Sequence, residues 1–416
     1  MAAEAQTLPA HLAQNSVLHG DKPAVVADGR SITYAELDRT SGRLAARLVA
    51  AGIGKSARVG VLMPNGTEWV LSAAAAGRVG ACLVPLSTLL RPPGLLAQLR
   101  TAAVTHLIAA PEFGGRFYLE ELEEMAPGVA ATTAADGRHP AVPSLRRVWS
   151  YQDLPRPEVD PALVEALGAV VRPADDLVIL FTSDSGGAPK GVIHTHGSSI
   201  RATAAGLASR CVGPEERLYL PVPFFSTDGF SGGLITALVA GATLVTEAIP
   251  EPERTLELLE RERATLFLGG PDQAVSLAGH PRFASADLSS LNPASLPEVL
   301  PPGRRPAPKA RLGLFSITES FGPYCGDRID IDMPPSKHGS CGRPFEGVDV
   351  RVTDPDTGTN LPSGAVGEIR LRGPNMMRAI CGRTRQEIFD HEGFYPTGDL
   401  GALDADGYLW SHGRRR

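Results

Sequence analysis

The segment of the chain with the most potential chemistry runs from an apolar stretch into hydroxyls, glycines and a lysine. It reads Leu-Phe-Thr-Ser-Asp-Ser-Gly-Gly-Ala-Pro-Lys-Gly-Val over residues 180–192. Glycines let backbone N–H groups approach a polyanion, hydroxyls donate hydrogen bonds, and Lys190 adds a point charge. The spacing does not fit the G-x-x-x-x-G-K-[ST] nucleotide loop, because Gly191 follows the lysine. The segment predicts a phosphate-binding loop of another kind, with an ordinary turn after a buried strand as the alternative.

Alternating strands and helices must hold this loop in place. Thr33 and Glu36 have the spacing of a capping box, and Gly52 ends the helix that follows. Apolar runs at 59–63, 107–110 and 177–181 predict buried strands. Such β–α alternation is typical of parallel sheets covered by helices on both faces.

The domain organisation predicted from this pattern has three parts. Residues 1–170 and 171–328 form two packed α/β subdomains with mostly parallel sheets, and the second carries the phosphate loop. From about residue 329 short β-like runs alternate with turns, which predicts a small β-rich, barrel-like subdomain at 329–416. The Pro-, Ala- and Gly-rich stretch 127–176 is interpreted as a linker or subdomain boundary.

Composition excludes several classes of protein. With 43% apolar and 21% charged residues, the chain is neither disordered nor a coiled coil. A net charge of −6 argues against bulk binding to nucleic acid or to a membrane surface. Five widely spaced cysteines without C-x-x-C argue against a zinc site or a disulfide framework, and the N-terminus does not look like a signal peptide, so we expect a cytoplasmic protein. The apolar stretch 229–246 contains four glycines and predicts a buried helix running into a strand.

Five motifs in a fixed order resemble those of the adenylate-forming superfamily, which contains acyl-CoA synthetases, luciferases and the adenylation domains of nonribosomal peptide synthesis. The loop at 180–192 resembles T-S-G-T-T-G-x-P-K-G, and Phe315-Ser-Ile-Thr-Glu319 resembles Y-G-x-T-E. Residues 339–344 resemble G-S-x-G-x-P, residues 364–369 resemble G-x-x-G-E-I, and Tyr395-Pro-Thr-Gly-Asp399 resembles the T-G-D box. The resemblance starts near Asp21 and covers essentially the whole chain.

The resemblance implies ATP-dependent adenylation of a carboxylic acid, with Mg²⁺ as cofactor. The residues implied to hold the β- and γ-phosphates are Thr182, Ser183, Ser185, Gly187 and Lys190. Thr318 would contact the α-phosphate, and Glu319 would help to coordinate Mg²⁺, which prefers oxygen ligands; these two residues and Lys190 are the implied catalytic set. Phe315 stands at the adenine-stacking position, while Asp399 and Arg414 would bind the ribose.

Three departures from the family pattern bear on these roles. Asp184 replaces a glycine of the phosphate loop, and a like charge at ~4 Å with an effective dielectric of ~20 costs on the order of 4 kcal/mol, so we expect its side chain to turn away. Ser316 replaces the glycine of Y-G-x-T-E. The resemblance also implies a C-terminal lid domain with a catalytic lysine, which we expect to find missing because the given sequence ends at Arg416, so no residue here is assigned that role.

The acid-binding side is predicted from Pro223-Phe-Phe-Ser-Thr-Asp-Gly229, which resembles P-F-F-H-x-x-G with Ser226 in place of the histidine. Asp228 lies where amino-acid-activating domains place the aspartate that binds the substrate amino group, and a charge-assisted hydrogen bond there would reject plain fatty acids. The alternative for Asp228 is a turn residue. Phe321 is a candidate wall of the substrate pocket or a core residue. For His194 and His196 a structural or substrate-contacting role is favoured over a transition-metal site.

Three functions remain open at this stage. The first is adenylation of an amino acid, with a β-amino acid favoured, and its transfer to a carrier-protein thiol, as in the stand-alone enzymes of macrolactam antibiotic pathways. The second is a fatty- or aryl-acyl-CoA ligase of the same superfamily, with CoA as the thiol acceptor. The third is a non-catalytic adenylate-binding protein, which Asp184 and the absent lid suggest.

Overall fold

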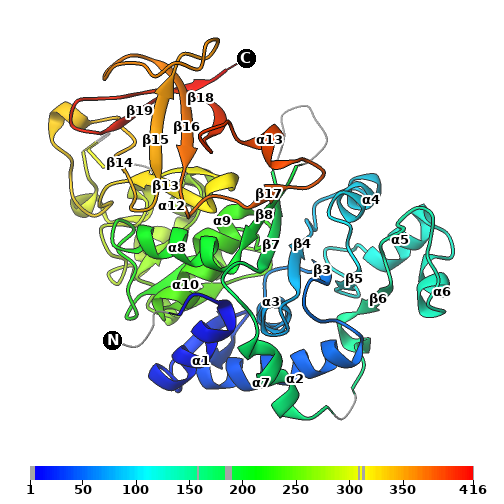
Figure 1. The fold of residues 1–416 in the computed structure, drawn as a ribbon. Coiled ribbons are helices and arrows are strands. Elements are labelled where there is room, and N and C mark those ends of the chain that lie inside the picture. Colours follow the sequence, from blue (N-terminus) through cyan, green and yellow to red (C-terminus); the bar gives the residue numbers. More distant parts are fainter. Residues whose placement is uncertain (1–4, 157–158, 183–189, 308–309, 312–313, 416) are drawn as a thin grey trace.

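A computed structural model describes residues 5–156, 159–182, 190–307, 310–311 and 314–415. Its largest sheet has seven strands and is parallel at one end and antiparallel at the other (Figure 1). In spatial order these strands are β17 (Ala379–Ile380), β8 (Gly191–Thr195), β7 (Asp176–Phe181), β4 (Cys82–Pro85), β3 (Arg58–Leu62), β5 (His106–Ala109) and β6 (Arg147–Ser150). β8 runs antiparallel to both of its neighbours, so the predicted phosphate loop joins β7 to β8 as a hairpin.

The second large sheet has five strands. Their order is β11 (Leu266–Phe267), β9 (Arg217–Leu220), β10 (Thr243–Thr246), β1 (Pro23–Ala27) and β2 (Arg30–Thr33), with only β2 antiparallel to its neighbour. The pairing of Val25 with Leu244 brings the start of the chain onto this sheet. The sheet is therefore assembled from segments that are far apart in the sequence.

Helices pack between the two sheets and on their outer faces. Alternating residues show this arrangement: Val25 and Val61 belong to one central core, whereas Val26 and Leu62 face two separate outer cores. The helices that contribute to the central core include α1 (Leu8–Leu18), α2 (Tyr34–Ala50), α3 (Thr67–Arg78), α7 (Pro161–Ala169), α8 (His196–Leu207) and α10 (Thr236–Ala240). The outer helices include α4 (Pro92–Thr101), α5 (Tyr118–Met125), α6 (Val129–Ala134), α11 (Pro252–Arg261) and α12 (Pro271–Ala278).

The local predictions agree with these elements. The capping box at α2 forms in full, since Thr33 Oγ1 accepts from the Glu36 N–H at 3.2 Å and Glu36 Oε2 accepts from the Thr33 N–H at 2.9 Å. The apolar stretch 229–246 folds as predicted into helix followed by strand: short α9 (Thr227–Gly229), a π-helix (Phe230–Ile235), α10 and β10. Among the described residues no helix is long and apolar enough to span a bilayer.

The linker and the boundary between the first two parts are corrected by the strand pairing. Stretch 127–176 contains α6, β6 and α7 rather than a linker, and β6 completes one edge of the seven-stranded sheet. Residues 1–170 and 171–328 each contribute strands to both large sheets, because β1 pairs with β10 and β7 pairs with β4. Residue 170 therefore does not separate two sheets.

The last part of the described chain is β-rich, as predicted, and its strands lie together beside the C-terminus, at the top of Figure 1. Its four-stranded antiparallel sheet contains β15 (Asp349–Thr353), β16 (Gly367–Arg372), β18 (Tyr395–Leu403) and β19 (Leu409–Arg414); a smaller sheet contains β12 (Phe315–Ile317), β13 (Gly322–Gly326) and β14 (Arg343–Pro344). β17 and α13 (Arg385–Ile388) lie in the connection between β16 and β18, and β17 pairs with β8 of the seven-stranded sheet.

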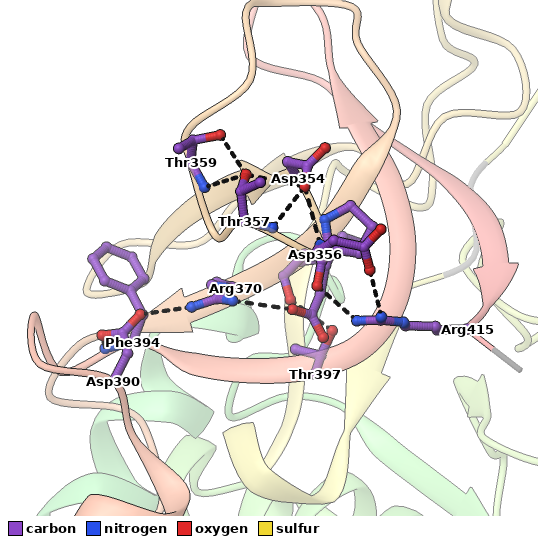
Figure 2. A network of polar contacts seen from close by, with 12 residues as sticks. Asp354, Asp356, Thr357, Thr359, Arg370, Asp390, Phe394, Thr397 and Arg415 are labelled. Atoms are coloured by element: carbon purple, nitrogen blue, oxygen red, sulfur yellow. Dashed lines mark hydrogen bonds and ion pairs between the residues drawn. The ribbon is translucent and has the colours of Figure 1, made fainter.

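Polar contacts fix the end of β19 against this sheet (Figure 2). Asp354 caps the turn that follows β15 by accepting from the N–H groups of Asp356 and Thr357 at 3.0 and 2.8 Å. Arg415 donates to Asp356 Oδ1 at 2.9 Å and to the Pro355 carbonyl at 2.8 Å. The turn therefore anchors the residue next to Arg414.

Candidate active site

The two described ends of the predicted phosphate loop meet at the end of the β7–β8 hairpin. The Thr182 N–H donates to the Lys190 carbonyl at 3.1 Å, directly beyond the pairing of Phe181 with Gly191. Ser183, Asp184, Ser185 and Gly187 lie outside the described residues, so their predicted roles, including the expected orientation of Asp184, remain predictions. The Thr182 hydroxyl is buried and has no hydrogen-bond partner among the described residues.

Thr318 is held from two sides at the end of β12. Its carbonyl accepts a hydrogen bond from His194 Nε2 on β8 at 2.8 Å, and its hydroxyl lies 3.0 Å from the hydroxyl of Thr227. His194 is fully buried, and burial lowers its pKa to about 4, so the ring is neutral and carries its proton on Nε2. His194 thus positions the backbone of Thr318, which is a structural role.

Glu319 follows Thr318 and is buried. The hydroxyl of Tyr395, the first residue of β18, donates to Glu319 Oε1 at 2.7 Å, and the Met377 N–H donates to its carbonyl at 2.8 Å. Burial, followed by the carboxylate itself, raises the pKa of Tyr395, which therefore remains a donor at neutral pH. Sequence reasoning did not find this role for Tyr395, although the residue stands at the start of the T-G-D box.

Asp399 and Arg414 occupy paired positions on β18 and β19. The Arg414 Nε lies 3.7 Å from Asp399 Oδ1, with the arginine exposed and the aspartate half-buried. Burial is the main cause that raises the Asp399 pKa, and Glu319 adds to it while Arg414 opposes it. Because the charge of Glu319 acts on Asp399, the predicted ribose ligand lies near the predicted magnesium ligand.

Two cavities share Asp228 and Ser316 as lining residues, whereas the predicted nucleotide and magnesium ligands Glu319, Asp399 and Arg414 are lining residues of neither. The first, of about 580 Å³, is lined on the phosphate side by Thr182, Thr227 and Thr318. The second, of about 450 Å³, has a largely apolar wall. The apolar side chains in this wall are Leu220, Val222, Phe267, Leu268, Leu296, Leu314 and Ile329.

Asp228 reaches the junction of the cavities from a tightly built turn. The Ser226 hydroxyl accepts from the Gly229 N–H at 3.0 Å and donates to the Pro223 carbonyl at 2.8 Å, so it caps α9. A Cβ on Gly229 would lie 1.9 Å from the Pro223 carbonyl oxygen, which only glycine avoids. Asp228 itself is exposed toward the cavities.

Two aromatic candidates lie outside the linings of both cavities. Phe321 is 1% exposed and packs in the core, with its ring 5.0 Å from His194 and 6.1 Å from Phe230 between centroids. The structure therefore places Phe321 in the core, and its predicted alternative role as a wall of the substrate pocket is wrong. Phe315 packs against Tyr324 at 5.5 Å, and its adenine-stacking role remains a prediction.

Arg210 is a site residue that sequence reasoning missed. It is 6% exposed, lines the second cavity together with Asp228, and donates to Thr236 Oγ1 at 2.6 Å. An isolated arginine between a helix and a strand carries no motif, so the sequence offered no signal for it.

Comparisons with known proteins agree on one family. The profile described as AMP-binding enzyme matches residues 12–380. The chain is 33% identical over 394 residues to a feruloyl-CoA synthase of an Amycolatopsis species, covering 93% of this chain and 74% of the relative. This chain belongs to the AMP-binding enzyme family.

Other relatives and solved structures extend the comparison. An indoleacetate–CoA ligase of Aromatoleum aromaticum is 29% identical over 411 residues, covering 96% of this chain and 76% of the relative. The fold matches a fatty acyl CoA synthetase from Mycobacterium tuberculosis with a TM-score of 0.78 at 24% identity, covering 98% of this chain and 78% of that one. It also matches O-succinylbenzoate coenzyme A synthetase from Bacillus subtilis, solved with AMP, with a TM-score of 0.76 at 21% identity, covering 97% and 98%.

The AMP-binding enzyme described here is an AMP-forming acid ligase that uses ATP with Mg²⁺. The residues on the page fit these groups. The Thr182 hydroxyl, buried and without a hydrogen-bond partner in the described part of the chain, is a donor available to a phosphate oxygen. Mg²⁺ usually takes one or two carboxylates together with substrate phosphates and water, and Glu319 supplies such a carboxylate in a fixed orientation.

Proposed function

We propose that this enzyme is an acyl- or aryl-CoA ligase. It holds the organic part of its acid in the second cavity and the phosphates of ATP in the first cavity. The observation that carries this proposal is the junction of the two cavities at Asp228 and Ser316, two residues before Thr318. An acid whose tail fills the apolar cavity would present its carboxylate where Thr318 meets the α-phosphate. The relatives named above as CoA ligases support CoA as the thiol acceptor.

The reaction then proceeds by positioning and charge neutralisation. A carboxylate oxygen attacks the α-phosphorus, the bond to pyrophosphate breaks, and the acyl-adenylate forms; a thiol then displaces AMP. Bound Mg²⁺ would neutralise phosphate charge beside Glu319. The chain's own contribution is to orient: His194 and Thr227 fix Thr318, Tyr395 fixes Glu319, and Asp399 would accept hydrogen bonds from the nucleotide sugar.

A second candidate is activation of an amino acid, with a β-amino acid favoured, for transfer to a carrier protein. Asp228 favours it, because an exposed carboxylate at the cavity junction can pair with a substrate ammonium. Arg210 weighs against it, since its guanidinium lines the same cavity as Asp228 and would repel an ammonium group. We therefore place this candidate second.

The test is ATP–pyrophosphate exchange with panels of aryl, fatty, α-amino and β-amino acids, followed by thioester formation with CoA or with a carrier protein. The first proposal predicts exchange with aryl or fatty acids and thioester formation on CoA. Amino-acid-dependent exchange that Asp228→Ala abolishes would instead establish the second candidate. The absence of exchange with every acid, in a protein that binds AMP, would overturn both. Glu319→Gln is the matched inactive control.

A further inference from the structure

Asn65 is a buried side chain that joins the two large sheets where their parallel strands end. It follows β3 of the seven-stranded sheet and is 7% exposed. Its Nδ2 donates to the Val222 carbonyl at 2.9 Å and to the hydroxyl of Thr246, the last residue of β10, at 3.1 Å. Its Oδ1 accepts from the Phe224 N–H at 2.7 Å. One side chain of the first sheet therefore holds the segment that follows β9 in the second.

The bond to Phe224 fixes one end of a peptide group whose other end supports the turn before α9. The carbonyl of this peptide group belongs to Pro223, and it accepts from the Ser226 N–H at 3.0 Å and from the Ser226 hydroxyl at 2.8 Å. A peptide group is planar, so its N–H and its C=O turn together. Rotation of the N–H away from Asn65 would therefore also move the carbonyl to which Ser226 is bonded.

The turn leads directly to the hydroxyl that holds Thr318. Ser226 caps α9, and Thr227, the first residue of α9, has its hydroxyl 3.0 Å from the hydroxyl of Thr318. The close approach of Gly229 to the Pro223 carbonyl leaves the turn little room to adjust independently of that carbonyl. Printed contacts thus run without a break from Asn65 to Thr318.

From these contacts we infer that Asn65 is a positioning residue for adenylation, which acts on Thr318 through the Pro223–Phe224 peptide group and the turn that follows it. The inference rests on the proposed function, which places the phosphates of ATP at Thr318. Asn65 lines neither cavity and needs no contact with a substrate. A misplacement of about 1 Å at a reacting centre can cost roughly 100-fold in rate, so a distant anchor can matter for catalysis.

Asn65→Ala removes all three hydrogen bonds, and Asn15→Ala is the matched control. Asn15 is also a buried asparagine, 5% exposed; it donates to the Leu238 carbonyl at 2.6 Å and lines neither cavity. Both variants should unfold at a lower temperature, because each leaves a buried backbone group without its partner. Only Asn65→Ala should lower the kcat of pyrophosphate exchange, by roughly 10- to 100-fold per folded protein, with the most active acid of the panel above as substrate.

A double-mutant cycle separates positioning from a general loss of stability. Thr227→Val removes the hydroxyl contact with Thr318 at a partly buried position, so the variant should fold. If Asn65 acts through Thr227, the double variant should lose no more than about twofold in kcat beyond the larger single loss, whereas independent effects would multiply.

Calorimetry gives a second readout, which does not depend on the acid. Asn65→Ala should weaken the binding of AMP by roughly tenfold or more and that of adenosine by no more than about twofold, because Thr318 would contact only the phosphate. Asn15→Ala should leave both affinities unchanged.

Three results would overturn the inference while leaving adenylation intact. The first is a kcat of Asn65→Ala equal to that of wild type, and the second is a cycle in which the two losses multiply. The third, which decides the matter if Asn65→Ala does not fold, is a kcat of Thr227→Val equal to that of wild type. Exchange by the wild-type enzyme with no acid at all would instead overturn the proposed function; equal losses of AMP and adenosine affinity in Asn65→Ala would then overturn this inference as well.

Discussion

Acid should unfold this protein in a range where its carboxylates are still largely ionised, because three buried histidines resist protonation. His106, His194 and His196 are each almost fully buried, and burial lowers the pKa of each to about 4 from an ordinary value of 6.5. His194 and His196 also lie in positions that matter for the site, on β8 and at the first turn of α8. Protonation would therefore disturb the support of Thr318 as well as the fold.

The sign and size follow from proton linkage. Between about pH 6.5 and pH 4 the unfolded chain binds protons that the folded chain does not, so the free energy of unfolding falls as the pH falls. At pH 5 a histidine shifted from 6.5 to about 4 contributes a loss of about 2 kcal/mol, and three contribute about 6 kcal/mol. This loss is comparable with the total stability of an ordinary domain, about 5–15 kcal/mol.

Urea unfolding at several pH values from 7.5 to 5 measures the decrease in the free energy of unfolding. The variant His194→Gln isolates the part of that decrease that is due to His194. The glutamine amide can replace the Nε2 donor to Thr318 but does not titrate, so the variant should lose about 2 kcal/mol less than wild type between pH 7.5 and pH 5. His412→Gln, an exposed position on β19, is the control and should keep the wild-type dependence. An unchanged pH dependence in His194→Gln would refute the neutral, buried state of this ring.

Three further outcomes are expected. Tyr395→Phe removes the 2.7 Å hydrogen bond to Glu319, which should cost about 1.5–3 kcal/mol. The kcat/KM for MgATP should therefore fall roughly 10- to 100-fold. An unchanged Mg²⁺ dependence of pyrophosphate exchange would contradict the positioning role of Tyr395. Asp399→Asn should weaken AMP binding, measured by calorimetry, by roughly tenfold or more. The midpoint of thermal unfolding should not fall, since burial already raises the Asp399 pKa and disfavours its charged form. A lower midpoint with unchanged AMP binding would mean that Asp399 serves only the stability of the fold. Gly229→Ala forces a contact of 1.9 Å with the Pro223 carbonyl and should cost about 1–3 kcal/mol or more, measured by thermal unfolding against Gly54→Ala; equal stability of the two variants would mean that the turn relaxes freely.

Local signals in the sequence were sufficient for the elements that carry the site. The Thr33–Glu36 capping box needs only neighbouring residues to form, and both of its hydrogen bonds are present. The apolar run 177–181 is long enough to identify a buried strand, and the hairpin with β8 puts Thr182 beside Lys190. Such features depend on interactions within a few positions along the chain, so the sequence contains them directly.

Long-range pairing could not be predicted in the same way. Val25 pairs with Leu244, and the residues around either position do not indicate that the two strands are neighbours. For this reason each of the two large sheets contains strands from both sides of the predicted boundary at residue 170. The short β6 within the supposed linker had weak periodicity, and its place became evident only through its pairing with β5.

Asp228 shows the same limit at the level of chemistry. Its position after Pro223-Phe-Phe suggested a ligand for an ammonium group, and that prediction treated the carboxylate as the only charge in the pocket. The fold brings Arg210, which follows α8 in the chain, to the same cavity as Asp228. The packing of α8 against the π-helix is a long-range contact, so no motif near Asp228 in the sequence could reveal a guanidinium in the same cavity.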